Sequence, residues 1–392
     1  MTAQVREFLA GPGARSDLLA LGEPTHGEPA FAASRNEIFP ALVQAGFRSI
    51  VLESDRVAGL AVDEYVGGGG STLDAALAAG FSPGFGALHG NRELLDWLRA
   101  HNAGRPPADR VSFHGFDAPL EMTGAPSPRR YLAQVVAYLA AHLDVHAPAD
   151  LDGLIGTDDR WSDQAAIMDH TRSVGGTPEA LRLRAIADDL RTELYANAPR
   201  LVAASSLAEW RRADLHADVA ARLLGYHAEA AAPAPQAVRT SRLLGVRDAW
   251  MAHNLLDIRA QEQHRGPTLV FAHNRHLQRQ PSTWQLAGMD LEWSCAGSIV
   301  SALLGDRYAV ILGSLGGSAT LGLPKAPDGT YEAALTEAAT GPTLFDRTQL
   351  SEVLEGRALT TRTDMTAEQG YFALDEPTIA ECDAILHIPA AR

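Results

Sequence analysis

Short runs of apolar residues recur along the chain, and four of them end on charged or imidazole side chains. The runs and the polar residues that follow them are LLALG with Glu23 and His26, SIVL with Glu53, VSF with His114 and Asp117, and TLVFA with His273, Asn274 and His276. Apolar runs of this length between polar turns are typical of buried strands, and the helical stretches between them indicate crossover connections. Ligands bind outside the carboxyl ends of the strands in open α/β sheets. The pattern therefore predicts an enzyme with one active site at these four strand ends.

The apolar pattern also predicts the order of the elements. We expect strands at residues 18–22, 49–52, 111–113, 268–272, 308–312 and 384–388, and helices at residues 30–45, 57–66 and 91–100. Pro40 should bend or break the first of these helices, because proline cannot donate the helical hydrogen bond. The glycine-rich stretch at 312–319 lacks the lysine of a phosphate-binding loop, so a tight loop at a strand end is expected there.

The middle of the chain has a different pattern of apolar residues from the two ends. Between about 129 and 259 the apolar residues recur at helical spacing, as at Leu132, Leu139, Leu181 and Leu190, and no strand pattern is present. We therefore predict an α/β fold with a mostly parallel central sheet flanked by helices. Its core would comprise residues 1–125 and 260–392, and a helical insertion at 126–259 would roof the cleft.

Composition narrows the class of protein. The chain has 392 residues, is 46% hydrophobic and has a formal net charge of −15, which argues against binding nucleic acid. Acidity of this kind favours a cationic substrate or partner, but more often serves solubility alone. Cys295 and Cys382 form no disulfide framework or metal pair and are expected to be core residues. No apolar stretch is long enough for a membrane span, so a cytoplasmic, soluble protein is expected.

The sequence GEPTHG at residues 22–27 gives the sharpest chemical signal. Glycine-flanked Glu23 and His26 can converge in one loop, where the carboxylate would orient the ring and favour its charged form. The structural alternative is a histidine bonded to its own loop. Glu53 should be partly desolvated at its strand end, and such a carboxylate is costly unless paired or used. Arg35, Arg56 and Arg247 are candidate partners, although each could equally form an ordinary surface ion pair.

The second cluster is HNRH at residues 273–276. One histidine could orient or protonate a substrate group, or the pair could bind a metal together with Glu23, His26 or Glu53. Because no metal-ligand spacing signature is present, we predict neither a metal nor another cofactor. The chain also lacks the GxSxG nucleophile motif. General-base activation of water, or of a substrate group, is therefore the expected chemistry.

Taken together, these motifs resemble the erythromycin esterase family. The matching pieces are GEPTHG at 22–27, Arg35, VLES with Glu53, FHGFD at 113–117, RDAWMAHN at 247–254, FAHNRH at 271–276 and DAILHIP at 383–389. The resemblance implies an α/β core with a largely helical second portion and hydrolysis of a macrolactone ester. It also implies that His26 is the general base, supported by Glu23 and Glu53, and that Arg35, His273 and His276 line the cleft and stabilise the oxyanion.

The chain departs from the family pattern at several places. FSPGFGALHGN precedes the helix at Asn91 where the family often has tryptophan-rich sequence, the catalytic loop contains Pro24 and Pro29, and His253 stands where glutamate is common. These departures could shape a different substrate pocket.

These motifs give a set of candidate site residues and leave more than one function open. The catalytic candidates are His26, Glu23, Glu53 and His273; the substrate-binding candidates are Arg35, Arg56, Asp117, Arg247, Asn274 and His276. The leading hypothesis is an esterase-like enzyme that hydrolyses a lactone or ester of natural-product metabolism. The alternatives are a tailoring enzyme that closes a ring by internal displacement, and a non-enzymatic binding protein on the same fold. The expected ligand is a small molecule, and the choice between a protein partner and a homo-oligomer is left open.

Overall fold

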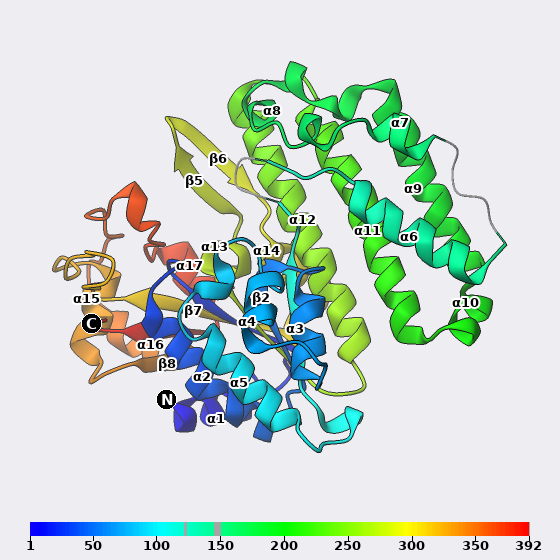
Figure 1. The fold of residues 1–392 in the computed structure, drawn as a ribbon. Coiled ribbons are helices and arrows are strands. Elements are labelled where there is room, and N and C mark those ends of the chain that lie inside the picture. Colours follow the sequence, from blue (N-terminus) through cyan, green and yellow to red (C-terminus); the bar gives the residue numbers. More distant parts are fainter. Residues whose placement is uncertain (121–123, 145–149, 392) are drawn as a thin grey trace. The chain divides into compact units, whose positions relative to one another are not determined.

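The computed structural model describes residues 1–120, 124–144 and 150–391 of the chain. It contains two compact units (Figure 1). The α/β unit comprises Met1–Asp117, Met251–Ser282 and Ser294–Arg392, and the helical unit comprises Ala118–Trp250 and Thr283–Trp293. The helical unit thus includes a segment beyond residue 260, which the sequence analysis assigned to the core.

The α/β unit is built on a seven-stranded sheet with the order β3-β2-β4-β1-β7-β9-β8. Its strands are β1 (Leu18–Glu23), β2 (Ser49–Asp55), β3 (Ser112–Asp117), β4 (Thr268–His273), β7 (Tyr308–Leu315), β8 (Thr343–Asp346) and β9 (Ala384–Ile388). All neighbouring strands pair in parallel except β8, which is antiparallel to β9. This arrangement confirms the predicted α/β fold with a mostly parallel central sheet.

Helices cover both faces of this sheet (Figure 1). They are α1 (Thr2–Ala10), α2 (Pro29–Gln44), α3 (Gly59–Val66), α4 (Leu73–Ala79), α5 (Asn91–Asn102), the end of α12 (Gln236–Glu262), α13 (Asn274–Leu277), α14 (Ala296–Leu304), α15 (Tyr331–Ala338), α16 (Arg347–Leu354) and α17 (Glu376–Glu381). Alternate residues of a strand point to opposite faces. Leu19 and Leu21 accordingly pack in one core with α2 and α5, whereas Leu18 and Ala20 pack in the other with α12 and α14.

The helical unit contains α6 (Arg129–His142), α7 (Leu151–Ile155), α8 (Ala165–Met168), α9 (Pro178–Ala196), α10 (Ala198–Ala204), α11 (Leu207–Ala230) and the start of α12. Leu132, Leu139 and Leu190 are buried at the predicted spacing, but Leu181 is exposed. A two-stranded hairpin, β5 (Ser282–Leu286) and β6 (Met289–Trp293), was not predicted. Its alternating pattern is short and contains polar residues on its exposed side, so it gives little apolar signal.

Helix α2 continues through Pro40 and is not broken there, because Phe39 and Leu42 on either side are buried and outweigh the lost hydrogen bond. Two other local expectations were wrong. The predicted tight loop at 312–319 begins later, since β7 continues through Gly313 and Ser314. His114 lies within β3 rather than at its carboxyl end.

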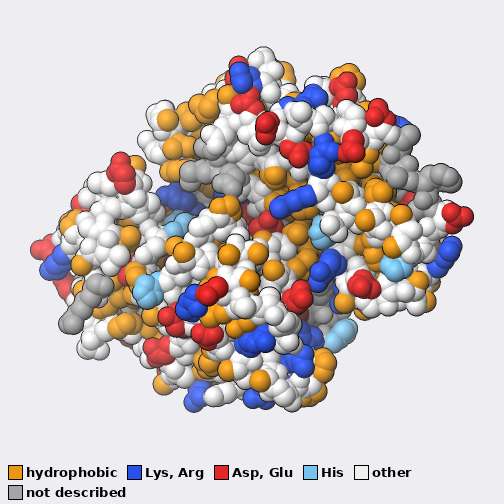
Figure 2. All heavy atoms as spheres, in the orientation of Figure 1, with side chains coloured by type: hydrophobic (Ala, Val, Ile, Leu, Met, Phe, Trp, Pro, Cys, Tyr) orange, Lys and Arg blue, Asp and Glu red, His pale blue; other side chains and the backbone are white. Residues whose placement is uncertain are grey.

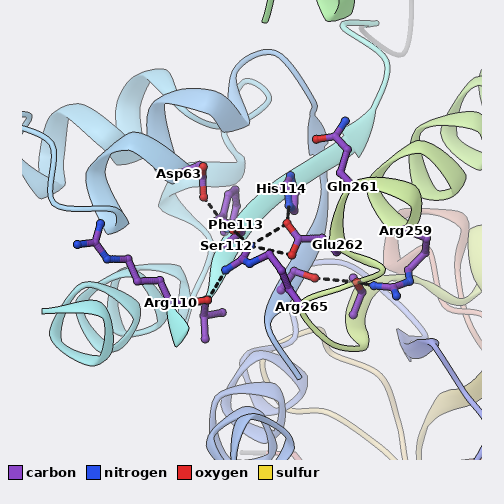
Figure 3. A network of polar contacts seen from close by, with 12 residues as sticks. Asp63, Arg110, Ser112, Phe113, His114, Arg259, Gln261, Glu262 and Arg265 are labelled. Carbon is purple, nitrogen blue, oxygen red and sulfur yellow. Dashed lines mark hydrogen bonds and ion pairs between the residues drawn. The ribbon is translucent and has the colours of Figure 1, made fainter. Parts of the chain in front are cut away.

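The position of His114 is explained by a polar network at the junction of β3 and α12 (Figure 3). Its Nε2 lies 3.1 Å from Glu262 Oε1, and Arg265 donates to both oxygens of Glu262 and to Ser112 Oγ. Burial opposes the charge of Glu262, but these partners outweigh it and lower the pKa of its carboxyl. His114 therefore anchors the end of α12 to the sheet.

Candidate active site

The candidate site includes two residues that lie opposite each other on neighbouring central strands. Glu23 ends β1, His273 ends β4, and the two residues are direct partners in the parallel ladder. Each continues the row that faces α2 and α5, after Leu21 and Phe271 respectively. Strand register therefore places the carboxylate and the imidazole side by side at the carboxyl edge of the sheet.

The loop after β1 holds His26 over this edge. His26 Nδ1 lies 2.8 Å from Glu23 Oε1, and Gly27 has a φ of 80°, which glycine adopts without strain. Thr25 Oγ1 donates to the carbonyl of Gln369 at 2.6 Å, and the Phe372 N–H donates to the carbonyl of Pro24 at the same distance. The loop is thus held by hydrogen bonds to Glu23 of its own strand and to the segment before α17.

Glu53 connects three histidines. Its Oε1 lies 3.7 Å from His26 Nε2 and 3.3 Å from His276 Nε2, and its Oε2 accepts the backbone N–H of His273 at 2.8 Å. The register between β2 and β3 shifts between Leu52 and Asp55, so Glu53 lies where the regular strand ends. The structure therefore brings together Glu23, His26, Glu53, His273 and His276, all from the α/β unit.

The electrostatics of His26 favour its charged form. Burial opposes a charge on the ring, but the charge of Glu53 and the hydrogen bond and charge of Glu23 outweigh burial, so the pKa of His26 is raised. Burial also raises the pKa of the Glu23 carboxyl. The His26 side chain is 40% exposed, against 10% for Glu23 and 6% for Glu53. Of these three groups, the imidazole is the one that solvent reaches most easily.

The electrostatics of His273, in contrast, favour its neutral form. Burial, followed by the charge of His26, holds its pKa well below the usual value, so the ring is neutral at pH 7. Its Nδ1 accepts the backbone N–H of Arg275 at 3.1 Å. A neutral ring with an accepting Nδ1 carries its proton on Nε2. His273 is thus a fixed hydrogen-bond donor whose ring centre lies 5.1 Å from that of His26.

A cavity of about 40 Å³ adjoins these groups. Glu23 and Glu53 line it together with Arg35, a residue only 1% exposed. Burial lowers the pKa of the Arg35 guanidinium to about 10, which leaves it charged at pH 7. The guanidinium donates to the carbonyl of Gly90 and to Asn91 Oδ1, each at 3.0 Å, and lies over the ring of Phe271. Arg35 therefore anchors the cavity wall as well as placing a positive charge beside Glu23.

Three further predicted substrate-binding residues lie directly after β2, on β3 and on α12. Arg56 is buried, pairs with Asp257 and donates to Asn254 Oδ1 at 2.9 Å, which joins β2 to α12. Asp117 ends the edge strand β3, three strands away from β1. Arg247 lies on the part of α12 that belongs to the helical unit.

Asn274 has a structural role in this arrangement. It is fully buried, donates to the Gly313 carbonyl at 2.8 Å and accepts the Gly313 N–H at 3.0 Å. A Cβ on Gly22 would lie 2.1 Å from Asn274 Oδ1, so the glycine of the GEPTHG loop makes room for this amide. Asn274 thereby ties the end of β4 to β7.

Asn274→Ala should therefore reduce stability. The substitution strands two buried backbone groups of Gly313, and we expect a loss of about 2 kcal/mol in the free energy of unfolding. Urea denaturation measures this loss. Asn197→Ala, whose amide bonds are solvent-exposed, is the matched control. Equal stabilities of the two variants would contradict the role assigned to Asn274.

The aromatic residues around the imidazoles were not predicted from the sequence. Phe85 meets the His26 ring edge-on at 5.5 Å between centres, and Phe372 meets the His273 ring at 6.3 Å. Phe85 lies in the FSPGFGALHGN segment, whose departure from the family pattern was the available signal. Nothing in the sequence around Phe372 marks it, because it reaches the site from a loop far along the chain.

Neither a metal-binding cluster nor a membrane-spanning helix is present among the described residues. Among residues 1–120, 124–144 and 150–391, no group of three or more His, Cys, Asp or Glu side chains is arranged to hold a metal ion. Within the same residues, every helix is too short or too polar to cross a bilayer. On the face drawn in Figure 2, acidic and basic side chains are interspersed rather than gathered by sign.

The fold and site define an α/β protein with a His–Glu cluster at the carboxyl edge of its sheet. Comparison with known proteins gives the family: the sequence model of the erythromycin esterase family matches residues 42–391, and the chain belongs to that family. The match begins within α2, so the GEPTHG loop lies before it. Membership supports an esterase-like hydrolase. No curated protein matches the chain in sequence.

Three solved structures share the fold. A Bacillus cereus protein has a TM-score of 0.73 at 19% identity, covering 100% of this chain and 92% of that one. A mutant of the erythromycin esterase EreC in its open conformation has a TM-score of 0.69 at 19% identity, covering 99% and 94%. A succinoglycan biosynthesis protein has a TM-score of 0.67 at 17% identity, covering 100% and 91%.

Proposed function

We propose that the protein is an esterase-like hydrolase in which His26 activates water for attack on the carbonyl of an ester or lactone from natural-product metabolism. The observation that carries this proposal is the placement of His26 between two carboxylates. Glu23 contacts Nδ1, Glu53 faces Nε2, and the ring itself is partly exposed. This is the environment of a general base whose protonated form is stabilised as it appears.

The proposed reaction follows from the two ring nitrogens. Glu23 fixes the Nδ1–H tautomer, so Nε2 is the atom that takes a proton from water. The water oxygen forms a bond to the carbonyl carbon as the proton moves to Nε2. When the tetrahedral intermediate collapses, the bond to the leaving oxygen breaks and the imidazolium returns the proton to that oxygen. Glu53 stabilises the imidazolium between these two steps.

His273 and Arg35 are the groups that would stabilise the negative charge that develops on the substrate oxygen. The Nε2–H of His273 is suited to donate to the oxyanion, because its ring is neutral and its other nitrogen is already occupied. Each of the three guanidinium nitrogens of Arg35 already donates within the protein. Arg35 would therefore act through its charge and through the wall it anchors, rather than by direct contact with the substrate.

Hydrolysis in labelled water tests this proposal. A panel of esters and lactones is incubated with the protein in H₂¹⁸O, and the acid product should gain one ¹⁸O atom, read by mass spectrometry. In ring closure by internal displacement, His26 would instead deprotonate a group of the substrate. The product would then carry no label, and hydrolysis would be refuted as the reaction.

A further inference from the structure

Segment 369–374 holds the loop that carries the proposed base. The carbonyl of Gln369 accepts the hydroxyl proton of Thr25 at 2.6 Å, and the N–H of Phe372 donates to the carbonyl of Pro24 at 2.6 Å. Proline has no N–H, so this carbonyl is the only hydrogen-bonding group that Pro24 offers. Both loop residues that directly precede the imidazole are therefore bonded to segment 369–374.

The same segment is fixed to the sheet by Tyr371. This residue is 3% exposed, and its hydroxyl accepts the N–H of Leu315, the last residue of β7, at 3.0 Å. The hydroxyl also lies 3.2 Å from the Leu315 carbonyl and 3.4 Å from Glu332 Oε1 of α15, and either oxygen can accept its proton. Glu332 is fully buried and accepts the Leu374 N–H at 2.8 Å as well. Tyr371 thus connects the segment to β7 and α15.

The charge state of His26 depends on where the loop places its ring. Around the ring lie Glu23 of β1, Glu53 of β2, His273 of β4 and His276 of α13. The two carboxylates favour the charged ring, whereas the charge of His276 opposes it. Nδ1 and Nε2 lie 2.8 and 3.7 Å from the carboxylate oxygens, and attraction between charges weakens with distance. A displaced loop would therefore return the pKa of His26 toward its ordinary value.

We propose that Tyr371 is a positioning residue of the candidate site: its hydroxyl fixes segment 369–374, and this segment holds His26 between the two carboxylates. The described residues that line the cavity do not include Tyr371, so it would act through the loop rather than on a ligand. Its importance for turnover rests on the proposed esterase function, but its effect on the His26 ring does not.

Two substitutions, each of which removes one hydroxyl, test the two ends of this connection. Tyr371→Phe removes the contacts with Leu315 and Glu332, and Thr25→Val removes the bond to Gln369. The pKa of His26 is measured by NMR titration of protein labelled with ¹³C at histidine Cε1, and the signal is assigned by its absence from His26→Ala. We expect both variants to lower this pKa. On an ester that the protein hydrolyses, kcat should fall by about 10–10²-fold with KM little changed, since the base is misplaced.

Thr268→Val and Tyr138→Phe are the matched controls. Thr268 is buried at the start of β4, the strand that His273 ends, and its hydroxyl lies 2.7 Å from Ser49 Oγ. The Tyr138 hydroxyl lies 3.0 Å from Ser205 Oγ within the helical unit. Both controls lose a hydroxyl contact away from segment 369–374, so the pKa of His26 and kcat should stay those of the unmodified protein.

The titration decides the inference without a substrate. An unchanged pKa of His26 in folded Tyr371→Phe or Thr25→Val overturns it, as does an equal shift in the controls. If Tyr371→Phe does not fold, Thr25→Val decides alone: a lowered pKa supports positioning by segment 369–374, and an unchanged one overturns it. If the folded protein hydrolyses no ester, the proposed function fails, while the titration still tests the role of Tyr371.

Discussion

His26→Ala is expected to lower kcat/KM for ester hydrolysis by about 10²–10⁴-fold, the range that a general base contributes. The His26 imidazole has Nδ1 on one carboxylate, and its Nε2 faces another. Without it, no side chain at this position takes the proton from water. The fold should survive, because the side chain is 40% exposed and little apolar surface is lost.

The measurement pairs steady-state kinetics on the best ester with thermal unfolding of the same preparation. His101→Ala is the control: His101 stacks on Trp97 of α5 and has no contact with the carboxylates of the site. We expect its activity to match that of the unmodified protein. If the His26 variant keeps full activity while remaining folded, His26 is not the base.

Glu53→Gln is expected to cost about 10²-fold in kcat/KM and to change its dependence on pH. The substitution keeps the size of the side chain but removes the charge that helps to stabilise the His26 imidazolium. His26 must be neutral to accept a proton, so activity of the unmodified protein should fall as pH drops through its raised pKa. In the variant that pKa is lower, and the acid limb of the profile should move to lower pH.

The pH profile distinguishes this role from a purely structural one. A substitution that only loosened the site would lower the rate at every pH without moving the acid limb. Glu64→Gln, an exposed change of the same kind on α3, should leave both the rate and the profile unaltered. An acid limb that stays in place, or moves to higher pH, in Glu53→Gln would refute the assigned electrostatic role.

Much of the α/β unit follows from local pattern. Six of the strands were predicted because parallel strands covered on both faces are continuously apolar, and such runs stand out in a sequence. The edge strand β8 escaped prediction. It has four residues, and only Leu344 and Phe345 are buried. Helix α2 shows that local pattern is also insufficient in the opposite sense. Proline tends to break a helix, but at Pro40 this local tendency is outweighed by packing against residues far away in the sequence.

The residues of the candidate site were likewise predictable from the sequence only in part. Polar residues at strand ends pointed to Glu23, His26, Glu53 and His273, and the structure brings these four together. The sequence did not distinguish Asn274 and Arg56, which hold elements together, from residues that face a ligand. A polar residue at a strand end gives the same sequence signal in both roles. Which role it has depends on the residues, distant in the sequence, that its side chain contacts.

The sequence by itself determined the parallel sheet, the helical middle and the edge at which chemistry is concentrated, because these depend on periodicity and on the rule that parallel strands end together. Only the tertiary structure decided the rest. It set the raised pKa of His26, the neutral tautomer of His273, and the cavity wall that runs from Arg35 through Asn91 to Phe85. These properties arise from burial and from contacts between segments far apart in the chain, and no local pattern of residues encodes either.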